Sequence, residues 1–380
     1  MIAIATQCFS PDLGGIEILM TSLADALTAQ GEAVSVFADR AHGGGVLQRP
    51  YPIRRFGLAR PLRRLMKRRA IARAFGDETV EGLFVDSWKS VAAIPPTPAP
   101  IAAFAWGTEL SPNASAAKAA RIRAAFARAY SIVACSHYTA DLARRHMADS
   151  SAKLIVVSPP VAPLPEPGPE ARAEFDRLIA GRGPILSTLA RLEPRKGVDA
   201  TLRAMPALRK DHPDLVFLIA GEGDDLWRLR RLAVDLGVGD AAVFLGGVRE
   251  PGRKAALLDR TDVYAMPSRR VGDSVEGYGI AYIEAAWRGV PAVAGNDGGS
   301  ADAVIDGETG LLCNGADDAS VLATLDRLLA DEQLRKRLGA TARARARAEL
   351  TWSTALPKYL AAIGRGDKLA PPASTPRGKP

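Results

Sequence analysis

Two glutamates offer the clearest chemistry in the sequence. Glu276 and Glu284 stand with seven residues between them. Gly277 and Gly279 precede a helical run that ends at Gly289. Carboxylates held at the head of a helix accept hydrogen bonds from sugar hydroxyls at fixed geometry. Two acids in a helical region otherwise indicate a solvated face, but the flanking glycines and the strand-helix-strand frame favour a binding site.

Another pair of residues is suited to hold a diphosphate. Arg191 and Lys196 follow an apolar run in the segment STLARLEPRKG. Arginine supplies a planar fork for two phosphate oxygens, and lysine supplies a mobile point charge. Cations are also common on the surface after a strand, so the alternative is that Arg191 and Lys196 are ordinary surface residues.

Near the N-terminus, Gly14 and Gly15 lie between an apolar strand and a helical run. Glycines allow the backbone to approach a ligand, and the free N–H groups of a helix start attract an anion. An ordinary glycine turn is the alternative. Because the segment lacks the G-x-G-x-x-G spacing, an NAD-dependent oxidoreductase is disfavoured.

Parallel strands are the elements that must position these residues. Short apolar runs alternate with longer helical patterns, which predicts βαβ units. The predicted strands lie at residues 2–6, 33–38, 83–86, 101–105, 131–135 and 154–157, and at residues 185–190, 215–220, 242–245, 262–266 and 291–294. Residues 158–170 contain six prolines and predict an interdomain linker. Since ligands of such sheets bind beyond the carboxyl ends of the strands, we expect the site in a cleft between two halves.

With the paired glutamates, the N-D-G-G loop at residues 296–299 and the G-G-x-E segment near the N-terminus, the chain resembles a family 4 retaining glycosyltransferase. The resemblance covers nearly all of residues 1–363 and implies the GT-B fold, an α/β class with two Rossmann-like doubly wound domains facing across a cleft. The implied parts are an acceptor-binding domain at residues 1–163, a nucleotide-sugar-binding domain at 164–350, a helix at 351–363 that returns to the first domain, and a disordered tail at 364–380.

The resemblance also implies a role for each candidate residue. The residues expected to bind the donor are Gly15, Arg191, Lys196, Glu276, Gly277, Tyr278, Gly279 and Glu284. Arg191 and Lys196 are expected to hold the diphosphate. Glu284 is expected to hold the ribose, and Glu276 with the backbone of the following loop to hold the transferred sugar. Because the cations and the helix end take over the work of a divalent ion, no metal or other cofactor is expected.

One position departs from the family pattern. Many members carry a His-Gly pair near the reacting sugar, whereas this chain has Trp106 before Gly107. Glu109 is the nearest candidate for an acceptor-side catalytic base, the alternative being an acid that merely stabilises a helix start. In a front-face retaining mechanism the departing phosphate can assist deprotonation of the acceptor. Stabilisation of the diphosphate by Arg191 and Lys196 is then expected to carry much of the rate, with Glu276 also at the reacting centre.

The donor and the acceptor follow from the same resemblance. The segment RRVGDSVEGYGIAYIEAA is most similar to bacterial GDP-mannose-dependent mannosyltransferases. This implies transfer of mannose to a lipid-linked, polysaccharide or glycolipid acceptor in cell-envelope glycan synthesis. Transferases that use UDP-glucose, UDP-N-acetylglucosamine or UDP-galactose share the motifs and stay open. So does a non-catalytic nucleotide-sugar-binding relative, because of Trp106, whereas a nucleotide-sugar epimerase is disfavoured by the spacing of the glutamates.

The net charge of +8 is concentrated in one segment, since residues 49–76 hold ten bases and no acid. Leu62, Leu65 and Met66 recur at helical spacing among the bases from Arg60 to Arg73, which predicts an amphipathic basic helix. Such a helix is expected to bind an anionic membrane, where each base contributes about 1 kcal/mol. A solvated helix, or a loop that grips a phosphorylated acceptor directly, is the alternative. Nucleic acid is not expected as a partner, because aromatic residues do not interleave these bases.

The remaining composition narrows the class of protein. Apolar residues make up 47% and charged residues 24% of the chain, which excludes a disordered or collagen-like protein. The three cysteines lie far apart and indicate neither a disulfide framework nor a zinc site. The N-terminus lacks a signal-peptide pattern and no apolar run reaches 18 residues, so we expect a cytoplasmic protein, peripheral at most on the inner face of the plasma membrane.

Overall fold

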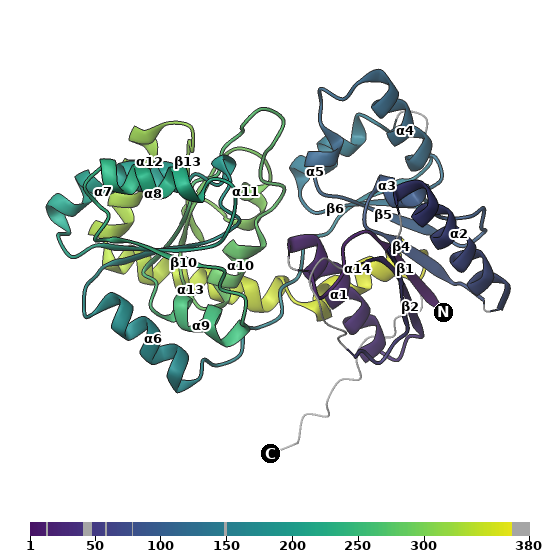
Figure 1. Ribbon diagram of the computed structural model, residues 1–380, viewed down its shortest axis with the longest axis horizontal. Helices are drawn as coiled ribbons and strands as arrows, with labels where there is room; N and C mark the ends of the chain where they lie inside the picture. Colours follow the sequence, from purple (N-terminus) through teal and green to yellow (C-terminus); the bar gives the residue numbers. More distant parts are fainter. Residues whose placement is uncertain (13, 41–47, 58, 78, 148–149, 367–380) are drawn as a thin grey trace, which may run out of the picture.

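Two parallel β-sheets organise the chain, one in each lobe of the molecule (Figure 1). The computed structural model describes residues 1–12, 14–40, 48–57, 59–77, 79–147 and 150–366. The predicted α/β fold with two doubly wound domains is confirmed. The residue boundaries of those domains stay predictions, and the predicted tail lies outside the described residues from residue 367 on.

The first sheet has seven parallel strands in the order β3-β2-β1-β4-β5-β6-β7. They are β1 (Ile2–Thr6), β2 (Val34–Asp39), β3 (Ile53–Phe56), β4 (Gly82–Val85), β5 (Ile101–Ala105), β6 (Ser131–Ala134) and β7 (Lys153–Val156). Every residue of β1, β4, β5 and β6 is buried, as expected of strands covered on both faces. The strand order reverses between β1 and β4, which predicts a ligand site beyond their carboxyl ends.

Helices cover both faces of this sheet. One face packs against α2 (Arg60–Asp77), α3 (Trp88–Val91), α4 (Ala116–Phe126) and α5 (His137–Arg144). The other face packs against α1 (Gly15–Ala29) and α14 (Trp352–Ala362). A short turn, η1 (Thr108–Leu110), follows β5.

The second sheet has six parallel strands in the order β10-β9-β8-β11-β12-β13 and reverses between β8 and β11. Its strands are β8 (Ile185–Leu189), β9 (Val216–Ala220), β10 (Ala242–Gly246), β11 (Val263–Met266), β12 (Ala292–Gly295) and β13 (Gly310–Cys313). Its helices are α6 (Pro169–Ile179), η2 (Pro194–Lys196), α7 (Val198–Asp211), α8 (Leu226–Asp235), α9 (Pro251–Asp259), α10 (Ile280–Trp287), α11 (Ser300–Ala303), α12 (Asp318–Ala330) and α13 (Glu332–Glu349).

The eleven predicted strands are present within one or two residues of their predicted bounds, but two strands were not predicted. β3 is an edge strand whose central residues, Arg54 and Arg55, are exposed, so it shows neither an apolar run nor a clean alternation. β13 is an edge strand of four residues that starts at a glycine. Both strands form because they pair with a neighbouring strand, and their own residues do not show a strand pattern that would predict them.

The chain passes between the two halves twice. Residues 157–168 form the first crossing, and the turn between α13 and α14 forms the second. Val161 N donates to Leu350 O at 3.0 Å, so the two crossings are bonded to each other. α14 then packs into the first half, where the Tyr359 ring lies 5.6 Å from the Phe104 ring between centroids.

Candidate functional site

The carboxyl edges of the two sheets meet, and their loops are in direct contact. Ser136 Oγ, after β6, donates to the carbonyl of Gly277, after β11, at 2.7 Å. Gly15 lies at the start of α1 and faces the first residue of α10, since a Cβ built on Gly15 would lie 3.4 Å from Ile280 Cδ1. The structure therefore places the predicted residues of both halves around one shared region.

Glu276 is the best-held acid of this region. It is 8% exposed, and one oxygen, Oε2, accepts from Arg195 Nη1 at 2.9 Å and from Lys196 Nζ. Burial alone raises the pKa of a carboxyl, but the charges and hydrogen bonds of Lys196 and Arg195 outweigh it and lower the pKa of Glu276 to about 2. Glu276 is therefore an ionised acceptor at neutral pH.

The two predicted diphosphate ligands lie in different surroundings. Lys196 ends η2 and is buried against Glu276, whereas the side chain of Arg191 is 72% exposed and lies 3.1 Å from Glu193 Oε1. Arg195 was not predicted, although it precedes Lys196 directly in the chain. Its burial follows from the tight turn of η2, which the single sequence indicates only by Pro194 and Gly197.

Glu284 lies in the middle of α10 and is 7% exposed. Lys254 Nζ of α9 donates to its Oε1 at 2.8 Å. Lys254 was not predicted, because its position next to Glu284 depends on the packing of two helices 30 residues apart. Lys254 holds one carboxylate oxygen of Glu284, and the ribose contact predicted for Glu284 stays a prediction.

The loop that joins Glu276 to α10 is supported by the second glycine loop. Gly299 N donates to Glu276 O at 2.8 Å, and Gly298 has φ +77°, with the space for a side chain taken by Glu276 O. Tyr278 is 3% exposed, and Gly279 caps α10 with φ +95°. The N-D-G-G loop is thus packed rather than free, because only glycine fits against the carbonyls of the facing loop.

The helix that follows this loop, α11, begins at Ser300, and Gly299 is its cap. The Ser300 hydroxyl pairs with Ser268 Oγ at 2.9 Å in the buried interior.

Trp106 occupies the position of the histidine found in many family members. Its ring stacks on Phe104 at 5.2 Å, and its Nε1 donates to Asp86 O at 2.6 Å. Its own carbonyl fills the space next to the Gly277 Cα. Trp106 therefore packs and positions the contact between the halves and offers no titratable group.

Glu109 lies in η1 behind Trp106. Its Oε1 accepts from Trp106 N at 2.7 Å, and burial raises the pKa of the carboxyl despite that hydrogen bond. Burial also raises the pKa of Cys135 to about 12, with further contributions from the charges of Glu109 and Glu276. The charges of both carboxylates therefore reach the same thiol, and the role of Glu109 as a base stays a prediction.

Two family models match the chain. One is described as "Glycosyltransferase Family 4" and matches residues 13–163, and the other as "Glycosyl transferases group 1" and matches residues 170–345. This chain is a glycosyltransferase with a family 4 domain followed by a group 1 domain. The two matched ranges follow the two sheets of the fold.

Several curated relatives of this glycosyltransferase are named as mannosyltransferases. A "GDP-mannose-dependent alpha-(1-6)-phosphatidylinositol monomannoside mannosyltransferase" from Mycolicibacterium smegmatis is 41% identical over 192 residues, which is 50% of each chain. A monoacylated-substrate counterpart from Corynebacterium glutamicum is 40% identical over 171 residues, 44% of each chain. The aligned segments thus span about half the length of these relatives.

Solved structures share the fold of this glycosyltransferase. A sucrose-phosphate synthase from Thermosynechococcus elongatus has a TM-score of 0.77 and 21% identity, covering 95% of this chain and 98% of its own. Anabaena HepE, in complex with UDP and glucose, has a TM-score of 0.77 and 17% identity, covering 96% of this chain and 100% of its own. These likenesses establish the GT-B arrangement of the two halves.

The basic segment of this glycosyltransferase contains β3 and α2. α2 begins at Arg60, whose side chain lies outside the described part, and it turns Leu62, Leu65 and Met66 outward, at 49, 44 and 43% exposure. One predicted surface base is an exception. Lys67 is buried, because its Nζ bonds Thr6 O at 2.8 Å and pairs with an Asp39 oxygen.

Among the residues that the structure describes, no helix has the length and apolar character needed to cross a bilayer. No three His, Cys, Asp or Glu side chains in the described ranges gather in a way that could hold a metal ion.

Proposed function

We propose that this protein transfers mannose from GDP-mannose, with retention of configuration, to a phosphatidylinositol-type glycolipid acceptor. The observation that carries the proposal is the buried Glu276, held ionised by Lys196 and Arg195 where the second sheet reverses its strand order, opposite Gly15 of the first sheet. The activities of the mycobacterial and corynebacterial relatives suggest the sugar, the nucleotide and the acceptor class.

The donor is proposed to bind by exchange of ionic partners. Lys196 and Arg195 both bond Glu276 in the free protein, and a diphosphate that attracts these cations releases Glu276 to accept from the sugar hydroxyls. Arg191, exposed at the same turn, adds a third cation. Glu284, oriented by Lys254, accepts from the ribose.

The transfer step needs one bond to form and one to break. The acceptor hydroxyl oxygen bonds to the anomeric carbon as the bond from that carbon to the phosphate oxygen breaks. The hydroxyl proton passes to the departing phosphate or to Glu109. Since Arg191, Arg195 and Lys196 neutralise the charge that develops on the diphosphate, we propose that no divalent metal is required.

We also propose that α2 holds the enzyme on the inner face of an anionic membrane. The exposed Leu62, Leu65 and Met66 lie on one helix with the exposed bases Arg68 and Arg69. Apolar side chains that enter a bilayer and bases that meet its charged head groups reinforce each other. Such binding places the enzyme where a glycolipid acceptor lies.

A panel of nucleotide-sugars tests the donor. GDP-mannose at 100 times its dissociation constant is expected to stabilise the protein by about 2.7 kcal/mol, read as a rise in melting temperature. Transfer of labelled mannose to phosphatidylinositol mannoside in the presence of excess EDTA then tests the activity without a metal. Stabilisation by UDP-sugars alone would show that the donor is a UDP-sugar. Stabilisation without transfer would leave a non-catalytic nucleotide-sugar-binding relative, and no response to any nucleotide-sugar would overturn the proposal.

A further inference from the structure

A cavity of about 560 Å³ lies in the first half of the chain. Its wall includes Gln7, the residue after β1, and the segment that follows β4. These are the two strands between which the order of the first sheet reverses, the point where such sheets bind ligands. The cavity therefore holds the same topological position in the first sheet as Glu276 and Lys196 hold in the second.

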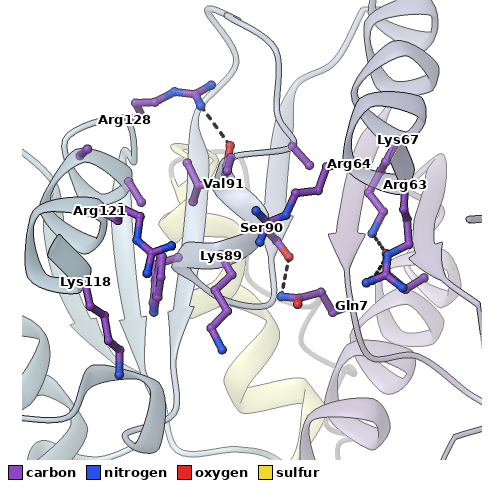
Figure 2. A pocket seen from close by; sticks show the side chains of 16 residues that line it. Gln7, Arg63, Arg64, Lys67, Lys89, Ser90, Val91, Lys118, Arg121 and Arg128 are labelled. Atoms are coloured by element: carbon purple, nitrogen blue, oxygen red, sulfur yellow. Dashed lines mark hydrogen bonds and ion pairs between the residues drawn. The ribbon is translucent and has the colours of Figure 1, made fainter. Parts of the chain in front are cut away.

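The side chains around this cavity are strongly basic. The charged ones are Arg63, Arg64, Lys67, Lys89, Lys118, Arg121 and Arg128, with Asp39 as the single acid. Figure 2 shows the bases of α2 on one side of the cavity and those of α4 on the other, with Lys89 and Ser90 between them. Cations that converge from three helices favour a ligand with several negative charges.

Three of the seven bases already have partners. Arg63 and Lys67 pair with Asp39, and Arg128 donates to the carbonyls of Val91 and Ile94 at 3.0 and 2.7 Å. Asp39 is therefore shared by two cations, and the cavity lining offers no other carboxylate to the remaining bases.

The remaining four bases, which make no ion pair with any described carboxylate, are Arg64, Lys89, Lys118 and Arg121. Lys89 and Arg121 both lie over the Trp88 ring, 5.9 and 5.8 Å from its centroid. Trp88, which lines the cavity, also has a buried Nε1 donor without an acceptor in the described chain. Bases that line one cavity without a carboxylate partner of their own favour the binding of an anion.

A short chain of contacts joins the cavity to the donor region. Gln7 Nε2 donates to Ser90 Oγ in the cavity wall at 3.3 Å, and Gln7 N donates to Asp86 Oδ2 at 2.5 Å. The carbonyl of Asp86 accepts from Trp106, which touches Gly277 of the second half. The wall of the cavity is therefore linked through packed residues to the loop that carries Glu276 and Gly277.

We infer that this cavity binds the phosphate ester of the acceptor, with Lys118 and Arg121 of α4 and Arg64 of α2 as its ligands. Arginine and lysine on two sides suit a phosphate oxygen cluster, because each contributes charge-assisted hydrogen bonds. The inference rests on the proposed function for the identity of the acceptor, and on the cavity alone for the binding of phosphate.

A matched pair of variants tests the inference. Arg121 and Arg123 are both exposed on α4, but only Arg121 lines the cavity. Binding of glycerophosphoinositol, the deacylated head group, to the full chain is measured by calorimetry. Arg121→Gln is expected to weaken binding roughly 10- to 100-fold, as for loss of a hydrogen bond between charged groups, and Arg123→Gln to leave it unchanged. Equal binding by all three proteins, or equal weakening in both variants, overturns the inference.

Further arms separate the sources of the phosphate. Titration with inorganic phosphate measures recognition of the phosphate alone, and vesicles of phosphatidylinositol in phosphatidylcholine measure the lipid-borne form. Both inorganic phosphate and the vesicles are expected to bind Arg121→Gln more weakly than Arg123→Gln. The ligand that binds the unmodified chain more tightly identifies the natural source of the phosphate. Nucleotide-sugar stabilisation of Arg121→Gln is expected to match that of the unmodified chain. If Arg121→Gln is stabilised normally by nucleotide-sugars and binds the head group as tightly as the unmodified chain, the cavity proposal alone is overturned. If no nucleotide-sugar stabilises the unmodified chain, the proposed function is overturned.

Discussion

At the scale of single residues, Glu276 joins stability to function. Its pKa is lowered from 4.5 to about 2, so its ionisation stabilises the folded state above pH 4.5, and this stabilisation is lost as the pH falls from about 4.5 toward 2. Glu276→Gln leaves the buried Lys196 without its ion-pair partner and leaves Arg195 paired with Glu193 alone. We expect a loss of about 3 kcal/mol in the free energy of unfolding at pH 7, and transfer activity reduced at least 100-fold.

Thermal unfolding at pH 7 and pH 3.5 checks the first part of this prediction, and initial rates with labelled donor check the second. Glu222→Gln is the control, since its pair with Arg249 is exposed and is expected to contribute less than about 1 kcal/mol. Equal effects of the two substitutions on stability would contradict the role assigned to the buried contact.

Glu109 gives a second prediction at this scale. A glutamine retains the oxygen that accepts from Trp106 N but removes the acid whose pKa is raised by burial. The ionised form of such an acid costs stability at neutral pH, so Glu109→Gln is expected to unfold at the same temperature or higher. If Glu109 takes the acceptor proton, kcat falls about 100-fold and the acidic limb of the pH profile disappears. Unchanged kcat and an unchanged profile would reduce Glu109 to a positioning contact.

At the scale of elements, α2 carries the membrane prediction. Arg68, Arg69 and Arg73 are exposed and do not line the cavity, so changing all three to Gln affects the membrane contact without changing the cavity wall. We expect partitioning to anionic vesicles to fall roughly 100-fold, at about 1 kcal/mol for each base. Sedimentation with vesicles measures it. The control changes three exposed bases of α13 to Gln, namely Lys336, Arg337 and Arg347. Equal losses in both proteins would show a response to net charge alone.

The helices and strands also show which features of the fold and the site the sequence predicts. Buried parallel strands are readable because each is a continuous apolar run, and the spacing of Glu276 and Glu284 points to one helix head. The sequence did not predict the roles of Arg195 and Lys254, because their partners lie 81 and 30 residues away along the chain. It did not predict the basic cavity, because the lining residues come from different helices. Such positions depend on helix packing, which a pattern within one segment does not contain.

At the scale of the whole molecule, polar contacts hold the two halves together beside the donor region. Asp302 Oδ2 accepts from His137 N and pairs with His137 Nδ1, both at 2.7 Å, and Asp273 accepts from Ser111 and Asn113 at 2.6 Å each. The hydrogen bonds from Ser111 and Asn113 lower the pKa of Asp273, so acidification weakens this contact.

Removing both acids should open the arrangement. We expect the double variant Asp273→Asn and Asp302→Asn to show a larger radius of gyration by X-ray scattering and a several-fold higher KM for the donor, because closure must then be driven by the ligand. Asp235→Asn, within an exposed pair on α8, is the control. A radius of gyration and a donor KM equal to those of the control would assign the closed arrangement to the chain crossings instead.

The return of α14 has a consequence for how the protein is made. The buried face of β1, β4 and β5 is closed by Leu356, Tyr359 and Leu360, which are synthesised after the whole second half. At roughly 5 to 20 residues per second, translation of that half takes on the order of 10 to 40 s. During this time the part of the first sheet that α14 covers in the folded protein is exposed to solvent. We therefore expect the nascent chain to bind chaperones until α14 leaves the ribosome.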